Sequence, residues 1–127
     1  MPASSYLVAA RTLAPDLVAW RRHLHRHPEL AFCEVATAGF VRERLAALGV
    51  EASAPMAGGT GLTALVRGRG DGPTVALRAD MDALPIPEDT GADYASTVPG
   101  VAHLCGHDAH TTMLLGAAAL LAAQPPA

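Results

Sequence analysis

Apolar residues recur at helical spacing in two places in the first half of the chain. In the first, Leu17, Trp20 and Leu24 lie three and four residues apart after Pro15, a residue type that favours the first turn of a helix. The residue before Pro28 is biased away from helical backbone angles. The pattern therefore predicts a helix that begins at Pro15 and ends just before Pro28.

The second helical pattern is more regular than the first. Ala38, Val41, Leu45 and Leu48 recur at intervals of three or four residues, and Gly49 follows them as a C-terminal cap. We expect a second helix that ends at Gly49 and buries this apolar face.

The period changes after this helix. A glycine-rich turn at 58–61 is followed by two short apolar runs, 62–66 and 74–77, which are separated by a loop of the hairpin type at 68–73. Both runs read as strands, and 98–103 reads as a weaker strand. Helices followed by strands predict the α/β fold class.

Residues 110–123 are apolar on every side of a helix, so this predicted helix must be surrounded by protein. Its uninterrupted apolar run, from Met113 to Ala123, is about eleven residues long, whereas a bilayer span needs about twenty. We therefore expect two helices, then strands and a buried helix, with no membrane segment.

Composition narrows the function further. The chain has 127 residues, enough for one domain, and its net charge of -3 with no cluster of basic residues argues against nucleic-acid binding. The N-terminus lacks the basic and apolar regions of a secretory signal, so we expect a cytoplasmic location. In that setting a disulfide between Cys33 and Cys105 is the less favoured interpretation.

The richest chemistry lies at 105–110, where Cys105, His107, Asp108 and His110 fall within six residues. Thiolate and imidazole are the ligands of zinc and similar divalent ions, and a turn through Gly106 can direct Cys105 and His107 at one ion. The alternative is a buried cysteine beside a capping aspartate, with His110 in solvent. The six residues alone do not decide between them.

A second candidate group follows the apolar run 74–77. Asp80 and Asp82 lie two apart on an extended segment, so both carboxylates project to the same side. They can ligate a cation, orient a ligand imidazole or hold a reacting water. The alternative, which the segment alone favours, is that Asp80 and Arg78 satisfy each other and nearby amides.

The basic segment 21–29 carries three alternating histidines, at positions 23, 25 and 27. A spacing of two residues scatters side chains around a helix, so this segment reads as a basic, partly exposed helix end that complements the helix dipole. Cys33, just beyond it, reads as a small buried residue.

Together these segments resemble the N-terminal part of an M20-family metal-dependent amidohydrolase, in the aminoacylase and hippurate-hydrolase-like branch. The resemblance rests on six stretches: RRHLHRHPE at 21–29, GTGL at 59–62, TVALRADMDALP at 74–85, YA at 94–95, VPGVAHLCGHDAH at 98–110 and MLLGAA at 113–118. The pairing of RADMDALP with CGHDAH at this separation is specific.

The resemblance implies roles for five residues. Cys105 and His107 would ligate a two-metal centre, and Asp82 would support a ligand histidine. Asp80 falls where related metallopeptidases have the histidine ligand itself, and, like His110, it is a candidate for a supporting role. A cysteine at position 33, where an acidic residue is expected, departs from the family pattern.

The resemblance also implies a fold, the first half of a zinc-peptidase-like (phosphorylase/hydrolase-like) catalytic domain over 1–127. The family's general-base glutamate, its remaining metal ligands and its dimerisation domain match nothing in these residues. The implied reaction is hydrolysis of the amide bond of a small N-acyl amino acid with two divalent metals, drawn from Zn, Mn, Ni and Co. We expect the chain alone to be a truncated, inactive form. The alternative is a non-catalytic remnant that binds a partner or a metal, and its apolar surfaces favour self-association.

Overall fold

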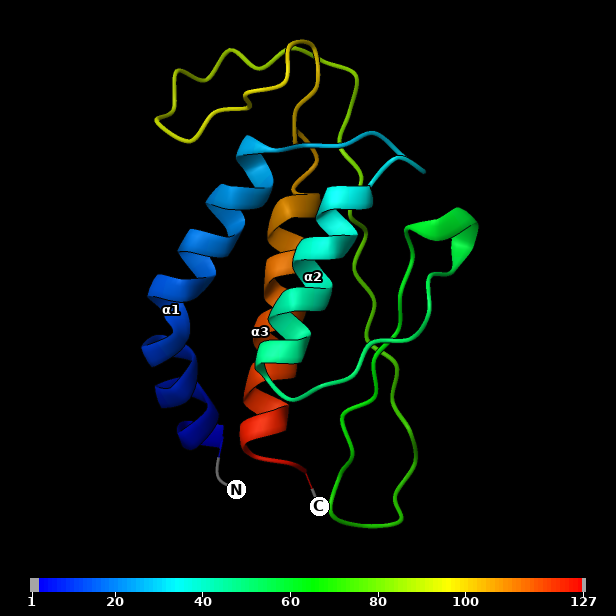
Figure 1. Ribbon diagram of the computed structural model, residues 1–127. Helices are drawn as coiled ribbons and strands as arrows, with labels where there is room; N and C mark the ends of the chain where they lie inside the picture. The colour runs from blue at the N-terminus through cyan, green and yellow to red at the C-terminus, as the bar shows by residue number, and fades with distance from the viewer. Residues whose placement is uncertain (1–2, 127) are drawn as a thin grey trace.

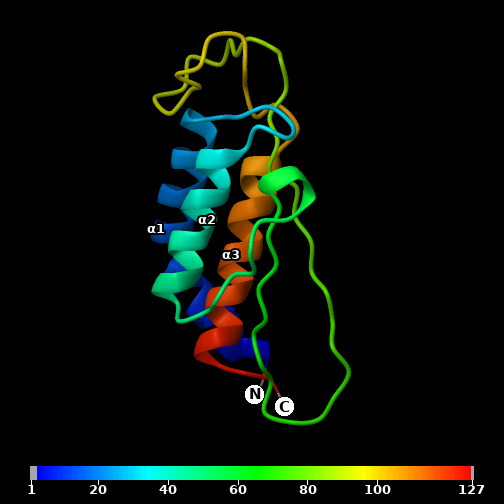
Figure 2. The same ribbon diagram turned by 45° about the vertical axis from the view of Figure 1, so that its right-hand side comes forward.

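The computed structural model describes residues 3–126 and contains three α-helices packed beside a set of extended segments (Figure 1). The helices are α1 (Ala3–Arg26), α2 (Val35–Ala47) and α3 (His107–Ala123), with one turn of 3₁₀-helix, η1, at Ala57–Gly59. Helix α3 packs against both α1 and α2, and the extended chain runs along its remaining side (Figure 2).

Helix α1 begins far earlier than the pattern predicts, so the expected start at Pro15 is wrong. Pro15 lies inside the helix, where it removes one backbone hydrogen bond. Packing against α3 compensates on both sides of the proline: Tyr6 Oη donates to Gln124 O at 2.9 Å, and Leu17 contacts Gly116. The predicted end before Pro28 is confirmed, since α1 stops at Arg26.

Helix α2 confirms the second prediction. Ala38, Val41 and Leu45 are buried, and Gly49 adopts φ +72° just beyond the end of the helix, a conformation that favours glycine. Val41 and Leu45 form the hydrophobic core with Val50 and with Leu115 of α3.

The predicted strands do not form a continuous ladder within residues 3–126. The segments 62–66 and 74–77 are extended, but the expected strand at 98–103 is wrong over its first half, because 98–100 forms a turn in which Val101 N donates to Val98 O. The sheet-like contacts are isolated bridges, such as Ala52 with Ala64 and Leu84 with Ala102. The loop at 68–73 opens wide and joins no hairpin (Figure 1). A strand needs a partner chain at hydrogen-bonding distance along its length. Within the described residues, 62–66 and 98–103 each have a single bridge, at Ala64 and Ala102, and 74–77 has none.

Helix α3 begins at His107, three residues before the predicted start, and is not enclosed on every side. Leu115 and Ala119 are buried against the other helices, whereas Met113 is 61% exposed. Within the described residues, no helix is long and apolar enough to cross a membrane.

A long irregular loop, 84–104, lies over the adjoining ends of α1 and α3 (Figure 1). It is tied to the end of α1, because Thr97 donates through both its backbone N and its Oγ1 to Arg26 O, at 2.9 and 2.8 Å. The Arg22 guanidinium lies 4.8 Å from the centre of the Tyr94 ring. These contacts hold the loop against the end of α1, next to the first turn of α3.

Candidate metal centre

Two backbone features bring the acidic segment 78–83 to the first turn of α3. Ala83 N donates to Glu29 O at 2.8 Å, and Leu84 pairs with Ala102, which anchors the segment directly after Asp82. Gly106 adopts φ +80° and turns the chain into α3, so that His107 is the first helical residue.

His107 is oriented by Asp82. Its Nδ1 lies 2.9 Å from Asp82 O and 3.0 Å from Asp82 Oδ1. Both partners are acceptors, so Nδ1 carries the proton and Nε2 presents its lone pair. A histidine held by a carboxylate through one nitrogen and open at the other is the usual arrangement of a metal ligand.

Asp80 lies between the two histidines of α3. His110 Nδ1 donates to its Oδ1 at 2.7 Å, and His107 Nε2 lies 3.6 Å from its Oδ2. The hydrogen bond from His110 lowers the pKa of Asp80, so the carboxylate is ionised at neutral pH. Thr111 Oγ1 donates to Asp80 O at 2.9 Å and fixes the backbone below this side chain.

These groups form a donor set that fits a divalent cation. Asp80, His107 and His110 each offer one ligand atom, and these atoms lie within 4.8 Å of one another. The predicted ion pair between Arg78 and Asp80 is present at 3.8 Å, but it leaves Asp80 in contact with both histidines. Two imidazoles and a carboxylate suit zinc and other first-row ions.

Cys105, predicted as a metal ligand together with His107, is an exposed free thiol and is not part of this donor set. A buried position is the alternative interpretation for Cys105 and the prediction for Cys33, and it is wrong for both, because both are exposed. Residue 105 precedes the Gly106 turn, so its side chain is not held by the helix that positions the histidines.

On its other side, the first turn of α3 is held by a buried ionic network. The Asp108 side chain is fully buried and accepts hydrogen bonds at Oδ2 from Arg21 Nε at 3.1 Å and His25 Nδ1 at 2.8 Å. Burial acts to raise the pKa of Asp108, but the hydrogen bond from His25 and the Arg21 charge outweigh it, and the net pKa is lowered.

His25 also reaches the long loop. Its Nε2 lies 3.0 Å from Glu88 Oε1, and the Glu88 carboxylate in turn accepts from Ser96 N and Thr90 Oγ1. The hydrogen bond from Ser96, followed by that from Thr90, lowers the pKa of Glu88 to about 2. The helix end is partly exposed, as expected, with His23 and His27 exposed, but His25 is buried at the junction of α1, α3 and the loop.

The sequence patterns missed His25 and Glu88. A spacing of two residues among histidines says only that they point in different directions, and here one of those directions leads into the protein. Glu88 lies in an irregular loop with no periodicity to mark it. His103 is also buried, and among the described residues neither of its ring nitrogens has a hydrogen-bond partner. Burial lowers the pKa of His103.

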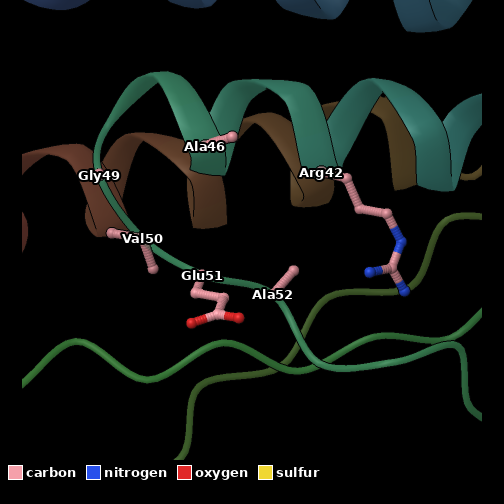
Figure 3. A pocket seen from close by; sticks show the side chains of 6 residues that line it. All are labelled: Arg42, Ala46, Gly49, Val50, Glu51 and Ala52. Carbon is pink, nitrogen blue, oxygen red and sulfur yellow. The ribbon is translucent and has the colours of Figure 1, made fainter.

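A surface pocket of about 380 Å³ lies elsewhere, at the end of α2 (Figure 3). It is lined by Arg42, Ala46, Gly49, Val50, Glu51 and Ala52. It contains no histidine or cysteine, and Glu51 is its one carboxylate, so the donor set at the start of α3 is the stronger candidate for chemistry.

Comparison with known proteins agrees with this geometry. The model of peptidase family M20/M25/M40 matches residues 76–126, which include the whole donor set. The chain is 55% identical over 104 residues to the N-acyl-L-amino acid amidohydrolase of Geobacillus stearothermophilus, covering 81% of this chain and 28% of that protein.

It is also 58% identical over 110 residues to a putative glutamate–cysteine ligase of Rhodococcus jostii, covering 87% of this chain but only 14% of that protein. Among solved structures, it resembles a dinuclear metal-binding peptidase of the M20 family from Bacillus subtilis, with a TM-score of 0.85 and 44% identity over 90% of this chain and 32% of that one.

The chain has the fold of part of an M20-type peptidase domain, and its residues 76–126 match the model of peptidase family M20. This confirms the predicted family and fold class. The chain spans between one seventh and one third of the length of these relatives.

Proposed function

We propose that the chain forms part of the metal centre of an amidohydrolase that cleaves N-acyl amino acids. The observation that carries this is the His107 ring, which is held at Nδ1 by Asp82 and faces Asp80 and His110 with Nε2. The name of the Geobacillus relative supplies the substrate class, an amino acid with an acylated nitrogen.

In this proposal His107, Asp80 and His110 hold divalent metal, and Cys105 is a further ligand by family resemblance. The group they would hold supplies Lewis-acid chemistry when bound: it would polarise the scissile carbonyl and lower the pKa of a coordinated water. Asp82 keeps the His107 Nδ1 proton in place, so that Nε2 remains available.

We further propose that the 127 residues alone hydrolyse these substrates slowly or not at all. Asp80 belongs to the donor set and Asp82 holds the His107 ring, so both carboxylates near the proposed metal already have a role other than general base. The general base and the remaining ligands would come from sequence outside these residues, since the chain matches only 28% of the length of the Geobacillus relative.

The test is a titration of the metal-free chain with Co²⁺, followed by its visible absorption, in wild type and in Asp80→Asn, His110→Gln and Cys105→Ala. Asp93→Asn is the control, because its side chain is 77% exposed and is not part of the donor set. We expect Asp80→Asn to weaken binding at least about tenfold. A thiolate-to-cobalt charge-transfer band that disappears in Cys105→Ala would identify Cys105 as a ligand. Equal affinities in all variants would refute the metal centre.

Hydrolysis is measured separately, with N-acetyl amino acids and added Zn²⁺ or Mn²⁺. Rapid turnover by the chain would show that the general base lies among these residues. It would refute the proposal of a partial site while leaving the metal centre intact.

A second candidate, a partner-binding role without catalysis, is favoured by one observation. Leu65, Val75 and Leu77 on the extended segments are 56%, 77% and 58% exposed, and exposed apolar side chains promote association. We expect self-association that rises with concentration in sedimentation velocity and falls in Val75→Lys. A monomer at all concentrations would refute this role.

A further inference from the structure

We propose that His25 is a positioning residue for the metal centre: it bridges Asp108 and Glu88, and so sets the orientation of the first turn of α3 that carries His107 and His110. The inference rests on the proposed function for the identity of the metal-binding groups. His25 lies on α1 and contacts none of the metal-binding groups directly.

The hydrogen bonds of His25 define its protonation state. Nδ1 lies 2.8 Å from Asp108 Oδ2 and Nε2 lies 3.0 Å from Glu88 Oε1. An ionised carboxylate only accepts hydrogen bonds, so both ring nitrogens must carry protons for both bonds to form. His25 is therefore an imidazolium between two carboxylates. Arg21 at Asp108 brings the local charges to balance.

Burial makes this arrangement rigid. The side chains of His25, Glu88 and Asp108 are 8%, 3% and 0% exposed. Water cannot replace a broken bond at such sites, so losing one partner leaves the other unsatisfied. Two other titratable rings face His25, Tyr94 edge-on at 5.3 Å and His103 at 6.4 Å between ring centroids.

Helix geometry carries this constraint to the metal centre. Successive residues of an α-helix point about 100° apart, so fixing the direction of Asp108 towards α1 also fixes that of His107. His107, His110 and Thr111 contact the segment 80–82 from the other side of the same turn. The turn is held between α1 and the acidic segment and cannot rotate away from either.

The electrostatic balance agrees with the geometry. Burial acts to lower the pKa of His25, but the hydrogen bonds to Glu88 and Asp108 outweigh it, and the net pKa is raised. The protonated form that the two carboxylates require is thus favoured by its surroundings.

The test compares wild type with His25→Gln and with His27→Gln, an exposed histidine two residues along as matched control. The ring nitrogens of His107 are followed by ¹⁵N NMR in the metal-free chain, at a temperature where circular dichroism shows each variant folded. Co²⁺ affinity is measured on the same samples.

We expect His25→Gln to convert the single Nδ1-protonated form of His107 into a mixture of tautomers and to weaken Co²⁺ binding about tenfold, with His27→Gln unchanged. If His25→Gln lowers only the melting temperature, and the His107 signals and Co²⁺ affinity match wild type, His25 is a purely structural group and the inference is wrong.

Two provisions keep the result decisive. If His25→Gln does not fold, Glu88→Gln removes one of the two carboxylates, and the same shift in His107 tautomers is expected at smaller amplitude. If wild type binds no Co²⁺, the proposed metal centre fails, while the His107 spectra still report whether His25 positions the turn.

Discussion

Replacing Asp108 by alanine is the sharpest test of the buried ionic network, because this carboxylate is fully buried and serves two cations. The bond from His25 is charged and shielded from water, and such a bond contributes about 1.5–3 kcal/mol. Arg21 is 47% exposed and can rehydrate, so its share is about 1 kcal/mol or less.

We therefore expect Asp108→Ala to lower the free energy of unfolding by about 2–4 kcal/mol. In a domain of this size that corresponds to a fall of about 10 °C in melting temperature. Asp108→Asn keeps the shape and one acceptor oxygen, so we expect a smaller loss. Urea unfolding followed by circular dichroism measures each value.

The matched control is Asp93→Ala. Asp93 also pairs with an arginine of α1, Arg22 at 3.7 Å, but its side chain is 77% exposed. Exposed pairs contribute less than about 1 kcal/mol, so this variant should unfold almost as wild type does. A loss below about 1 kcal/mol in Asp108→Ala, or equal losses in the two variants, would refute the argument from burial.

Three further predictions follow from other parts of the structure. Asp82→Asn should weaken Zn²⁺ binding about 10–100-fold in calorimetry by releasing His107; unchanged affinity would contradict this. The folded pKa of Glu88, about 2, lies below its ordinary 4.5, so its contribution to stability is full above pH 4.5 and is lost as the pH falls towards 2; urea midpoints should fall over that range, and less steeply in Glu88→Gln. Gly39→Ala, inside α2 with free space around it, should raise the free energy of unfolding by about 0.4–1 kcal/mol. Gly49→Ala, at φ +72°, should lower the free energy of unfolding by about 1 kcal/mol. An effect of the opposite sign at either position would contradict the prediction made for it.

The regular parts of the fold were predictable from local pattern. The four apolar positions of α2 and the cap at Gly49 mark that helix within a few residues. The start of α1 was not predictable in this way. Pro15 locally favours the first turn of a helix, but contacts with α3, about a hundred residues away, hold a helix on both sides of it.

The candidate site divides in the same manner. The motifs at 80–82 and 105–110 marked Asp80, Asp82, His107 and His110 as chemistry-bearing residues, and the structure brings these four together. Two features of the site depend on side-chain contacts between residues about 30 positions apart in sequence. They are the nitrogen of His107 that remains free and the position of Asp80 between two histidines.

The sequence by itself determined the family, the helical pattern of α2 and the residue types of the metal centre, because each depends on residues within a short stretch of the chain. Only the tertiary structure decided that His25 is buried between Asp108 and Glu88, and that segments with strand-like patterns meet at isolated bridges. The physical reason is the same in both cases. Charge pairing and strand pairing depend on partners distant in sequence, and local periodicity carries no information about them.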